Sequence, residues 1–292
     1  MINNKLILGT VQLGLDYGIN NTVGKPSRQD VKIILDTAYN NGIQLLDTAE
    51  AYGDSQERIG EYHRSTSNKF QIITKFSAAT KNLPFNIKER VKRNIETLNV
   101  SSLYCYMFHS FADFDSYFSS FEKDLYSLKE AGLVFKIGVS VYTNEEFEKV
   151  LTFKNIDLIQ LPFNLLDNIS KRGDILSKAR KKGVEIHARS AFLQGLFFKN
   201  PDNLTGHLNP LKAPLKKLQD LCSDNYKMND LALNYAYSQK HINHVLIGVD
   251  TVRQLQDNLA SINKAISRDQ IQKIDHINIK ETGLLNPSNW NL

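Results

Sequence analysis

Short apolar segments alternate with longer amphipathic segments along almost the whole chain. An uninterrupted apolar run of a few residues is typical of a strand that is buried on both faces. We predict such strands at residues 5–10, 43–48, 71–75, 103–109, 135–140, 157–163, 184–190 and 244–249.

The segments between these strands have the helical period. Ser27 and Asp30 resemble a capping box at the start of a predicted helix, and the pair Asn41-Gly42 is expected to end that helix. Its apolar positions follow the spacing i, i+3, i+4, i+7, at Val31, Ile34, Leu35 and Ala38. We predict further helices from Ser55, from Ile87, at 117–131, after the cap Thr143/Glu146, at 174–182, 211–222 and 228–239, at 252–262, and after the cap Ser267/Gln270.

Eight strand-then-helix units predict a parallel sheet, and eight is the number that closes a (β/α)8 barrel. No linker or change of composition divides residues 1–292, so we expect one domain. A doubly wound open sheet is the alternative, but no G-x-G-x-x-G follows the first strand. Two stretches, 11–27 and 197–214, have the composition of loops at the mouth of a barrel.

Composition narrows the choice of protein class. The 292 residues are 41% hydrophobic and 23% charged, with no apolar run of the roughly 20 residues that a membrane span needs. The formal charge of +5 is dispersed, so neither nucleic acid nor a membrane is expected as a partner. The N-terminus lacks the features of a signal peptide, which predicts a cytoplasmic protein. Cys105 and Cys222 are interpreted as small hydrophobic residues, without a disulfide or a metal motif.

Four side chains that could carry chemistry lie at or just after predicted strands. Asp47 closes the second strand, Tyr52 follows in the next turn, and Lys75 and His109 close the third and fourth strands. Alone, each has an ordinary interpretation: a helix cap, a half-buried aromatic, a surface charge and a core histidine. The carboxyl ends of barrel strands form the active face, however, so together they predict a catalytic group.

The segments LLDTAEAYG, IITKF and MFHS, which carry these residues, resemble the aldo-keto reductase family. The resemblance covers almost the whole chain and is greatest with the branch associated with bacterial sugar or polysaccharide pathways. It implies an NAD(P)H-dependent reductase that converts an aldehyde or ketone to an alcohol. Asp47, Tyr52, Lys75 and His109 match the family's catalytic tetrad.

This chemistry assigns a role to each residue. Tyr52 would donate the proton to the carbonyl oxygen, and the Lys75 ammonium would make the phenol a better acid. Asp47 would hold Lys75 in an ion pair at a mouth that we expect to be accessible to solvent. His109, as a neutral imidazole, would orient the carbonyl.

The resemblance also implies cofactor positions at the ends of other strands. Ser140 and Gln160 would hold the nicotinamide carboxamide, although Val141 stands where the family usually has Asn. The family's stacking Tyr is replaced by Arg189 in RSAF, whose planar guanidinium can also stack on a ring. The alternative for Arg189 is a structural ion pair. The remaining expected cofactor residues are Thr10, Gly248, Arg253, Gln254, Asp257 and Asn258.

Two other functions remain open. One is a regulatory barrel that binds nucleotide with little turnover, and the other is an aldolase or isomerase that uses Lys75 as a Schiff base. The substrate is expected to be a small carbonyl compound with the polarity of a sugar. We expect NADP(H) to bind better than NAD(H), because Arg253 can meet a 2′-phosphate, although Asp250 would favour NAD(H). Trp290 and the tail from Asn286 are expected over or beside the mouth.

Overall fold

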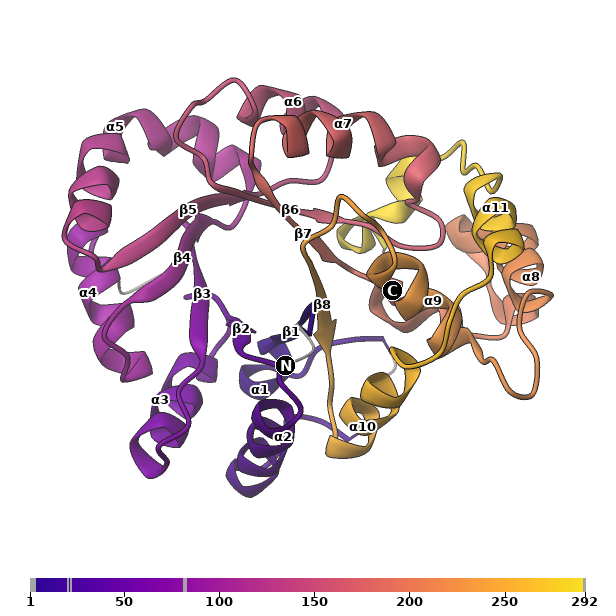
Figure 1. Cartoon of the computed structure of the whole chain (residues 1–292), viewed down its shortest axis with the longest axis horizontal. Coiled ribbons are helices and arrows are strands. Elements are labelled where there is room, and N and C mark those ends of the chain that lie inside the picture. Colours follow the sequence, from indigo (N-terminus) through magenta and orange to yellow (C-terminus); the bar gives the residue numbers. More distant parts are fainter. Residues whose placement is uncertain (1–3, 20, 22, 81–82, 291–292) are drawn as a thin grey trace.

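The computed structural model describes residues 4–19, 21, 23–80 and 83–290, and its central feature is a closed barrel of parallel strands (Figure 1). Each strand pairs with the next in sequence, and β8 pairs with β1, where Gly9 lies opposite Gly248. The strands are β1 (Leu6–Gly9), β2 (Leu45–Asp47), β3 (Gln71–Phe76), β4 (Leu103–Phe108), β5 (Val134–Ser140), β6 (Leu158–Pro162), β7 (Glu185–Arg189) and β8 (His244–Gly248). The predicted (β/α)8 fold is confirmed.

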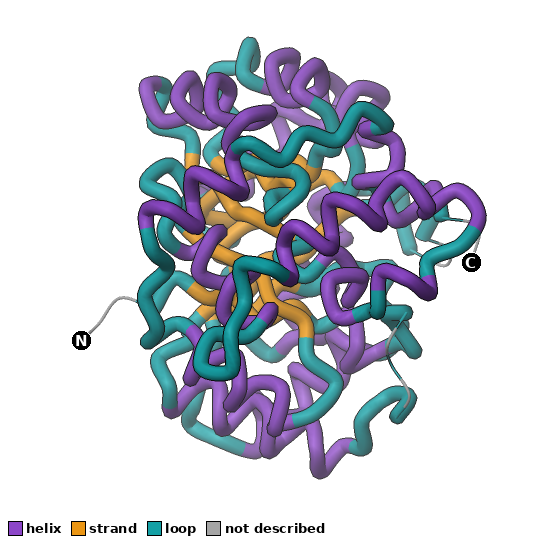
Figure 2. Tube along the Cα trace, turned by 90° about the vertical axis from the view of Figure 1, so that its right-hand side faces the viewer, coloured by secondary structure: helices purple, strands orange, loops and turns teal. Residues whose placement is uncertain are grey.

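The helices surround the strands, as Figure 2 shows from the side. They are α1 (Val11–Gly14), α2 (Arg28–Asn40), α3 (Ser55–Ser65), α4 (Ile87–Leu98), α5 (Phe111–Glu130), α6 (Asn144–Val150), α7 (Ile169–Lys181), α8 (Lys212–Gln219), α9 (Met228–Tyr237), α10 (Val252–Ser261) and α11 (Arg268–Asp275). Short 3-10 helices lie at Leu193–Phe198, Pro201–Asn203, Gly206–Leu211, Thr282–Leu285 and Pro287–Asn289.

Two helices begin earlier than predicted, and polar caps explain the difference. The Ser110 hydroxyl accepts the Asp113 N–H, so α5 begins at Phe111 instead of residue 117. The Asn168 side chain accepts the Ser170 N–H, so α7 begins at Ile169 instead of residue 174. Ser/Thr/Asn caps satisfy N–H groups that the first turn of a helix leaves free.

Apolar side chains fill the barrel interior and the layer between strands and helices. The interior cluster consists of Ile7, Leu45, Ile73, Cys105, Met107 and Leu158. Burial raises the pKa of the Cys105 thiol well above its ordinary value, as expected for a small hydrophobic residue. Cys222 is only half-buried, and burial raises its thiol pKa as well. Both cysteines are free.

A polar cluster lies at the amino ends of the strands, which is the end of the barrel away from the mouth. Glu185 accepts hydrogen bonds from Tyr104 at 2.8 Å and from Lys136, and it bonds His187 at 2.6 Å. His244 Nε2 lies 3.9 Å from the same carboxylate. Three of these residues could ligate a metal, with potential ligand atoms of Glu185, His187 and His244 within 4.8 Å of one another. Internal donors occupy the Glu185 carboxylate, whereas Nδ1 of His187 and Nδ1 of His244 are buried without a hydrogen-bond partner among the described residues.

The described residues of the tail pack against the turn that precedes them. Trp290 is buried, and its indole Nε1 donates to the Leu284 carbonyl at 2.9 Å. No described residue of 286–290 lines the large cavity at the barrel mouth. Residues 286–290 therefore do not line this cavity, and the placement of the tail beside the mouth stays a prediction.

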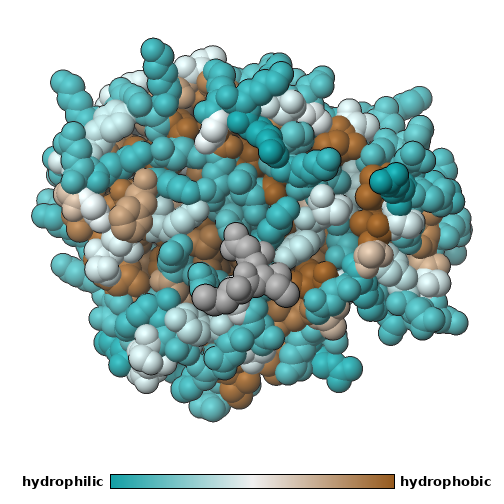
Figure 3. Space-filling model, in the orientation of Figure 1, coloured by the Kyte–Doolittle hydropathy of each residue, from teal (hydrophilic) through white to brown (hydrophobic). Residues whose placement is uncertain are grey.

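The outer surface is mainly hydrophilic on the face that Figure 3 presents, with small separate hydrophobic patches. Within the described ranges, none of the helices combines the length and apolar character needed to cross a lipid bilayer.

Candidate active site

All predicted site residues line one cavity of about 790 Å³ at the carboxyl ends of the strands. Strand geometry explains the convergence, since parallel strands end at the same rim and the residues lie at or just beyond those ends. The shared lining residues are Thr10, Asp47, Tyr52, Lys75, His109, Ser140, Gln160, Arg189, Gly248, Arg253, Gln254, Asp257 and Asn258. The volume lies in the range of small-molecule sites, roughly 300 to 1,000 Å³.

Lys75 and Asp47 form an ion pair at the floor of the cavity. The second Asp47 oxygen accepts from Gln160 Nε2 at 2.8 Å, and Lys75 Nζ also donates to the Thr48 carbonyl at 3.1 Å. Both side chains are 1% exposed, so the expectation of a solvent-accessible pair is wrong. Strand β6 supplies Gln160, whose amide bonds the Asp47 oxygen that Lys75 does not contact.

The pair controls the charge of Lys75. Burial alone would lower the pKa of its ammonium, but the attraction of Asp47, and then of Tyr52, outweighs burial and raises the pKa. Lys75 is therefore charged at neutral pH.

Tyr52 and His109 lie next to this ammonium. The Lys75 nitrogen lies 5.1 Å from the centroid of the Tyr52 ring, and the Tyr52 and His109 rings meet edge to face at 5.6 Å. Burial raises the pKa of Tyr52, and the charge of Lys75 opposes that rise. Burial, followed by the charge of Lys75, lowers the pKa of His109 to about 4. At neutral pH the site therefore holds a protonated phenol and a neutral imidazole.

Two glycines that the sequence analysis did not select allow the Tyr52 turn to adopt its position. A Cβ on Gly14, at the end of α1, would lie 1.9 Å from the Tyr52 carbonyl oxygen. Gly53 has a φ of +55°, and a Cβ there would lie 2.4 Å from the Gly14 oxygen. Only glycine permits this close crossing of two backbones. Helix α1 itself lies within a stretch that was expected to be loop.

A buried polar group supports the same turn from behind. Glu50 accepts hydrogen bonds from Arg90 and Asn94, both at 2.8 Å, and from the Tyr106 hydroxyl at 2.7 Å. The motif DTAEAYG contains this Glu, but its partners lie on α4 and β4 and no sequence pattern connects them.

The Thr10 hydroxyl makes hydrogen bonds to other protein groups. Its hydroxyl donates to the Asp47 carbonyl at 3.0 Å, and Ser55 Oγ donates to Thr10 at 2.9 Å. The residue lines the cavity, but its hydroxyl also ties β1 to the end of β2.

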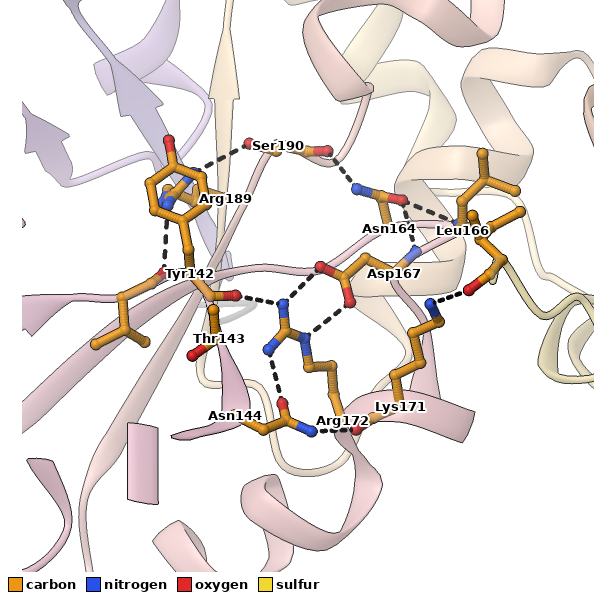
Figure 4. A network of polar contacts seen from close by, with 12 residues as sticks. Tyr142, Thr143, Asn144, Asn164, Leu166, Asp167, Lys171, Arg172, Arg189 and Ser190 are labelled. Atoms are coloured by element: carbon orange, nitrogen blue, oxygen red, sulfur yellow. Dashed lines mark hydrogen bonds and ion pairs between the residues drawn. The ribbon is translucent and has the colours of Figure 1, made fainter. Parts of the chain in front are cut away.

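Arg189 lies in the cavity wall, stacked on an aromatic ring. Its guanidinium carbon lies 4.0 Å from the centroid of the Tyr142 ring, and its Nη2 donates to the Val141 carbonyl at 3.2 Å. Figure 4 shows the ring and the guanidinium face to face. No ion pair involves Arg189 within the described ranges, so its interpretation as a structural ion pair is wrong.

A second arginine holds the backbone that presents Tyr142. Arg172 makes two hydrogen bonds to Asp167, at 2.8 and 2.7 Å, and donates to the Tyr142 carbonyl at 2.7 Å and to Asn144 at 2.7 Å (Figure 4). Buried bidentate pairs of this kind fix geometry. The network therefore connects α7 to the loop after β5.

Strand β8 and the first turns of α10 bound another part of the cavity. Gly248 lies against the Gln12 side chain, which a Cβ would approach to 2.4 Å. The Asp250 N–H donates to Gln254 Oε1 at 2.6 Å, and the Thr251 hydroxyl caps α10. The Arg253 side chain is 83% exposed, and its Nε lies 3.6 Å from Asp257 Oδ1.

Several lining residues have no recognisable sequence pattern. Tyr17, in the loop after β1, accepts a hydrogen bond from Gln194 at 2.8 Å, although the two are far apart in sequence. This contact joins the loops after β1 and β7 beside the cavity. Phe192 and Phe198 add apolar surface to the same wall.

Comparison with known proteins agrees with this geometry. The sequence model described as the aldo/keto reductase family matches residues 5–279. L-galactose dehydrogenase of Arabidopsis thaliana is 26% identical over 263 residues, which cover 84% of this chain and 82% of that protein. The uncharacterized oxidoreductase YqkF of Bacillus subtilis is 22% identical, with 82% and 85% covered.

Solved structures show the same fold. The holo form of aldo-keto reductase AKR11C1 from Bacillus halodurans superposes with a TM-score of 0.76 at 18% identity, covering 95% of this chain and 94% of that one. With the family match spanning nearly the whole sequence, the chain belongs to the aldo/keto reductase family and is an oxidoreductase of carbonyl compounds.

Proposed function

We propose that the protein reduces an aldehyde or ketone to an alcohol with NAD(P)H, with Tyr52 as the general acid. The observation that carries the proposal is the buried Lys75–Asp47 pair beside Tyr52 and the neutral His109, at the end of a cavity of substrate and cofactor size. When bound, the reduced nicotinamide supplies the hydride.

The proton chemistry follows from the charges of the four residues. Tyr52 keeps its proton at neutral pH because burial raises its pKa, so it can donate that proton as negative charge develops on the carbonyl oxygen. The neighbouring Lys75 ammonium stabilises the phenolate that remains, and Asp47 holds Lys75 in place. His109, neutral at this pH, has one ring N–H to donate to the carbonyl oxygen.

The cavity has polar atoms suited to a dinucleotide. Three buried atoms of lining residues have no partner within the described ranges: Gln12 Oε1, Arg189 Nε and Asp250 Oδ1. Buried polar groups are normally satisfied, so these atoms support a polar ligand that extends between β7 and β8. Ser140, Gln160 and Arg189 would hold the nicotinamide, and Gly248 and the start of α10 would hold the phosphates, with Thr10 nearby.

For the adenosine end, we propose that NADP(H) binds better than NAD(H). Lys227, Arg253 and Lys264 line this end and favour a 2′-phosphate, whereas Asp250 opposes it. Fluorescence titration with the two reduced cofactors tests the preference. Tighter binding of NADH would refute it, and Arg253→Ala would then change the NADPH dissociation constant little.

The substrate class is proposed as a small polar carbonyl compound. A sugar-like molecule is consistent with the relative named L-galactose dehydrogenase and with the polar side chains of Tyr17, Asn21 and Gln194 in the cavity. A screen of sugar-like and simple carbonyl compounds with NADPH tests this.

Two alternatives are less consistent with the site. A Schiff-base aldolase needs a neutral lysine, but Asp47 keeps Lys75 charged. A regulatory barrel would need no ordered acid group, whereas here the tetrad is assembled.

Tyr52→Phe separates a reductase from a regulatory barrel. We expect kcat for a reactive test aldehyde to fall by at least about a hundredfold, the scale of general acid catalysis, with little change in cofactor affinity. A variant that retains more than about a tenth of the parent rate would refute the role of Tyr52.

A further inference from the structure

Arg189 is a cation in the cavity wall, and its hydrogen-bond and stacking partners among the described residues are all neutral. Its Nη2 donates to the Val141 carbonyl at 3.2 Å, its Nη1 approaches Ser190 Oγ at 3.5 Å, and its planar group stacks on Tyr142. No carboxylate pairs with it within the ranges that the structure describes, and its Nε is buried without a partner. Its positive charge is therefore uncompensated by a neighbouring anion.

This charge acts at the catalytic end of the cavity. Arg189 contributes, after burial and Lys75, to the lowered pKa of His109, and it opposes the burial-induced rise of the pKa of Tyr17. Asp47 pairs with Lys75 directly, whereas no carboxylate pairs with Arg189 within the described residues.

An aromatic ring covers one side of the Arg189 guanidinium. The Tyr142 ring covers one face, and the network of Arg172 with the Tyr142 backbone holds that ring in place (Figure 4). Arg189 also lines the cavity, so a ligand bound there can lie next to this residue.

We propose that Arg189 makes the protein discriminate between the two redox states of its cofactor, binding the reduced dinucleotide more tightly than the oxidised one. The inference rests on the proposed function, which places the nicotinamide at Arg189, Ser140 and Gln160. A reduced nicotinamide ring is neutral and an oxidised one carries a positive charge, while the rest of the dinucleotide is identical. A fixed cation against the ring therefore repels only the oxidised form.

This repulsion appears at a defined step. The hydride takes two electrons from the ring to the carbonyl carbon, the proton of Tyr52 goes to the carbonyl oxygen, and the ring becomes cationic. An oxidised ring held at Arg189 would be repelled by the guanidinium, so the spent cofactor would bind more weakly and would exchange for a reduced molecule.

The test measures binding alone. Dissociation constants for NADPH and NADP⁺ are determined by calorimetric titration for the parent protein, Arg189→Gln and Arg189→Lys. We expect the ratio of the NADP⁺ to the NADPH constant to be at least about tenfold larger in the parent than in Arg189→Gln, which corresponds to about 30 mV in the two-electron potential of the bound cofactor. Arg189→Lys keeps the positive charge but loses the planar guanidinium, and it should keep most of the ratio of the NADP⁺ to the NADPH dissociation constant.

Arg253→Gln is the matched control, because it removes a cation at the opposite end of the cavity, where both redox states are identical. It should change the two constants by the same factor. Equal binding of both redox states by the parent protein, or the same ratio in the parent and Arg189→Gln, would overturn the inference. Failure of the parent protein to bind either form would refute the proposed function, and this inference with it.

Discussion

Lys75→Met tests whether the buried ion pair is a structural necessity as well as a catalytic one. The substitution removes the ammonium from Asp47, which is 1% exposed and, among the described residues, then keeps the Gln160 amide as its one side-chain donor. Removing one partner of a buried pair typically costs about 3 to 5 kcal/mol, because the other charge is left uncompensated. One strong hydrogen bond from Gln160 remains, so we expect a loss near the lower value, about 3 kcal/mol.

Urea unfolding followed by circular dichroism measures this loss, with an unchanged m-value as the condition for interpreting it. The double variant Asp47→Asn/Lys75→Met removes both charges, and its loss should be smaller than that of Lys75→Met alone. Lys149→Met is a matched surface control, because Lys149 pairs with Asp115 at 2.8 Å with both side chains about half exposed. It should cost at most about 1 kcal/mol.

The reasoning would be refuted if Lys75→Met cost no more than Lys149→Met. It would also be refuted if the double variant were destabilised by the full sum of its single variants. Either result would mean that Asp47 is solvated or reorganised when Lys75 is absent, despite its burial in the structure.

Three further predictions concern the frame of the site. Gly14→Ala should lower kcat together with stability, because its Cβ would displace the Tyr52 carbonyl; a fully active variant in a standard aldehyde assay would contradict this. Burial opposes ionisation of Glu185, but its bonds to His187, Lys136 and Tyr104 outweigh burial and lower its pKa from the ordinary 4.5 to about 2. The lowered pKa adds about 3 kcal/mol to the free energy of unfolding above pH 4.5, and this contribution should be lost as the pH falls toward 2. The free energy of unfolding of Glu185→Gln, measured in urea, should lack this acid-dependent loss. Trp290→Ala should lower the melting temperature without changing KM, since Trp290 is buried and lines no part of the cavity, and a raised KM would place the tail at the site.

The sequence alone determined the order and type of the barrel elements, because their signals are local. Apolar runs specify strands, the 3.6-residue period specifies helices, and the caps at Ser27, Thr143 and Ser267 are all present as capping boxes. The ends of the strands also located the cavity residues, since side chains at the carboxyl ends of parallel strands must converge on one rim.

The tertiary structure decided everything that depends on residues distant in sequence. Burial of the Lys75–Asp47 pair follows from Gln160 across the barrel, and the uncompensated charge of Arg189 follows from its position on Tyr142. The same holds for Glu185 at the barrel base, because two of its partners, Tyr104 and Lys136, lie on other strands. Side-chain charge and solvation depend on which strands face each other in space, and hydrophobic periodicity carries no information about that pairing.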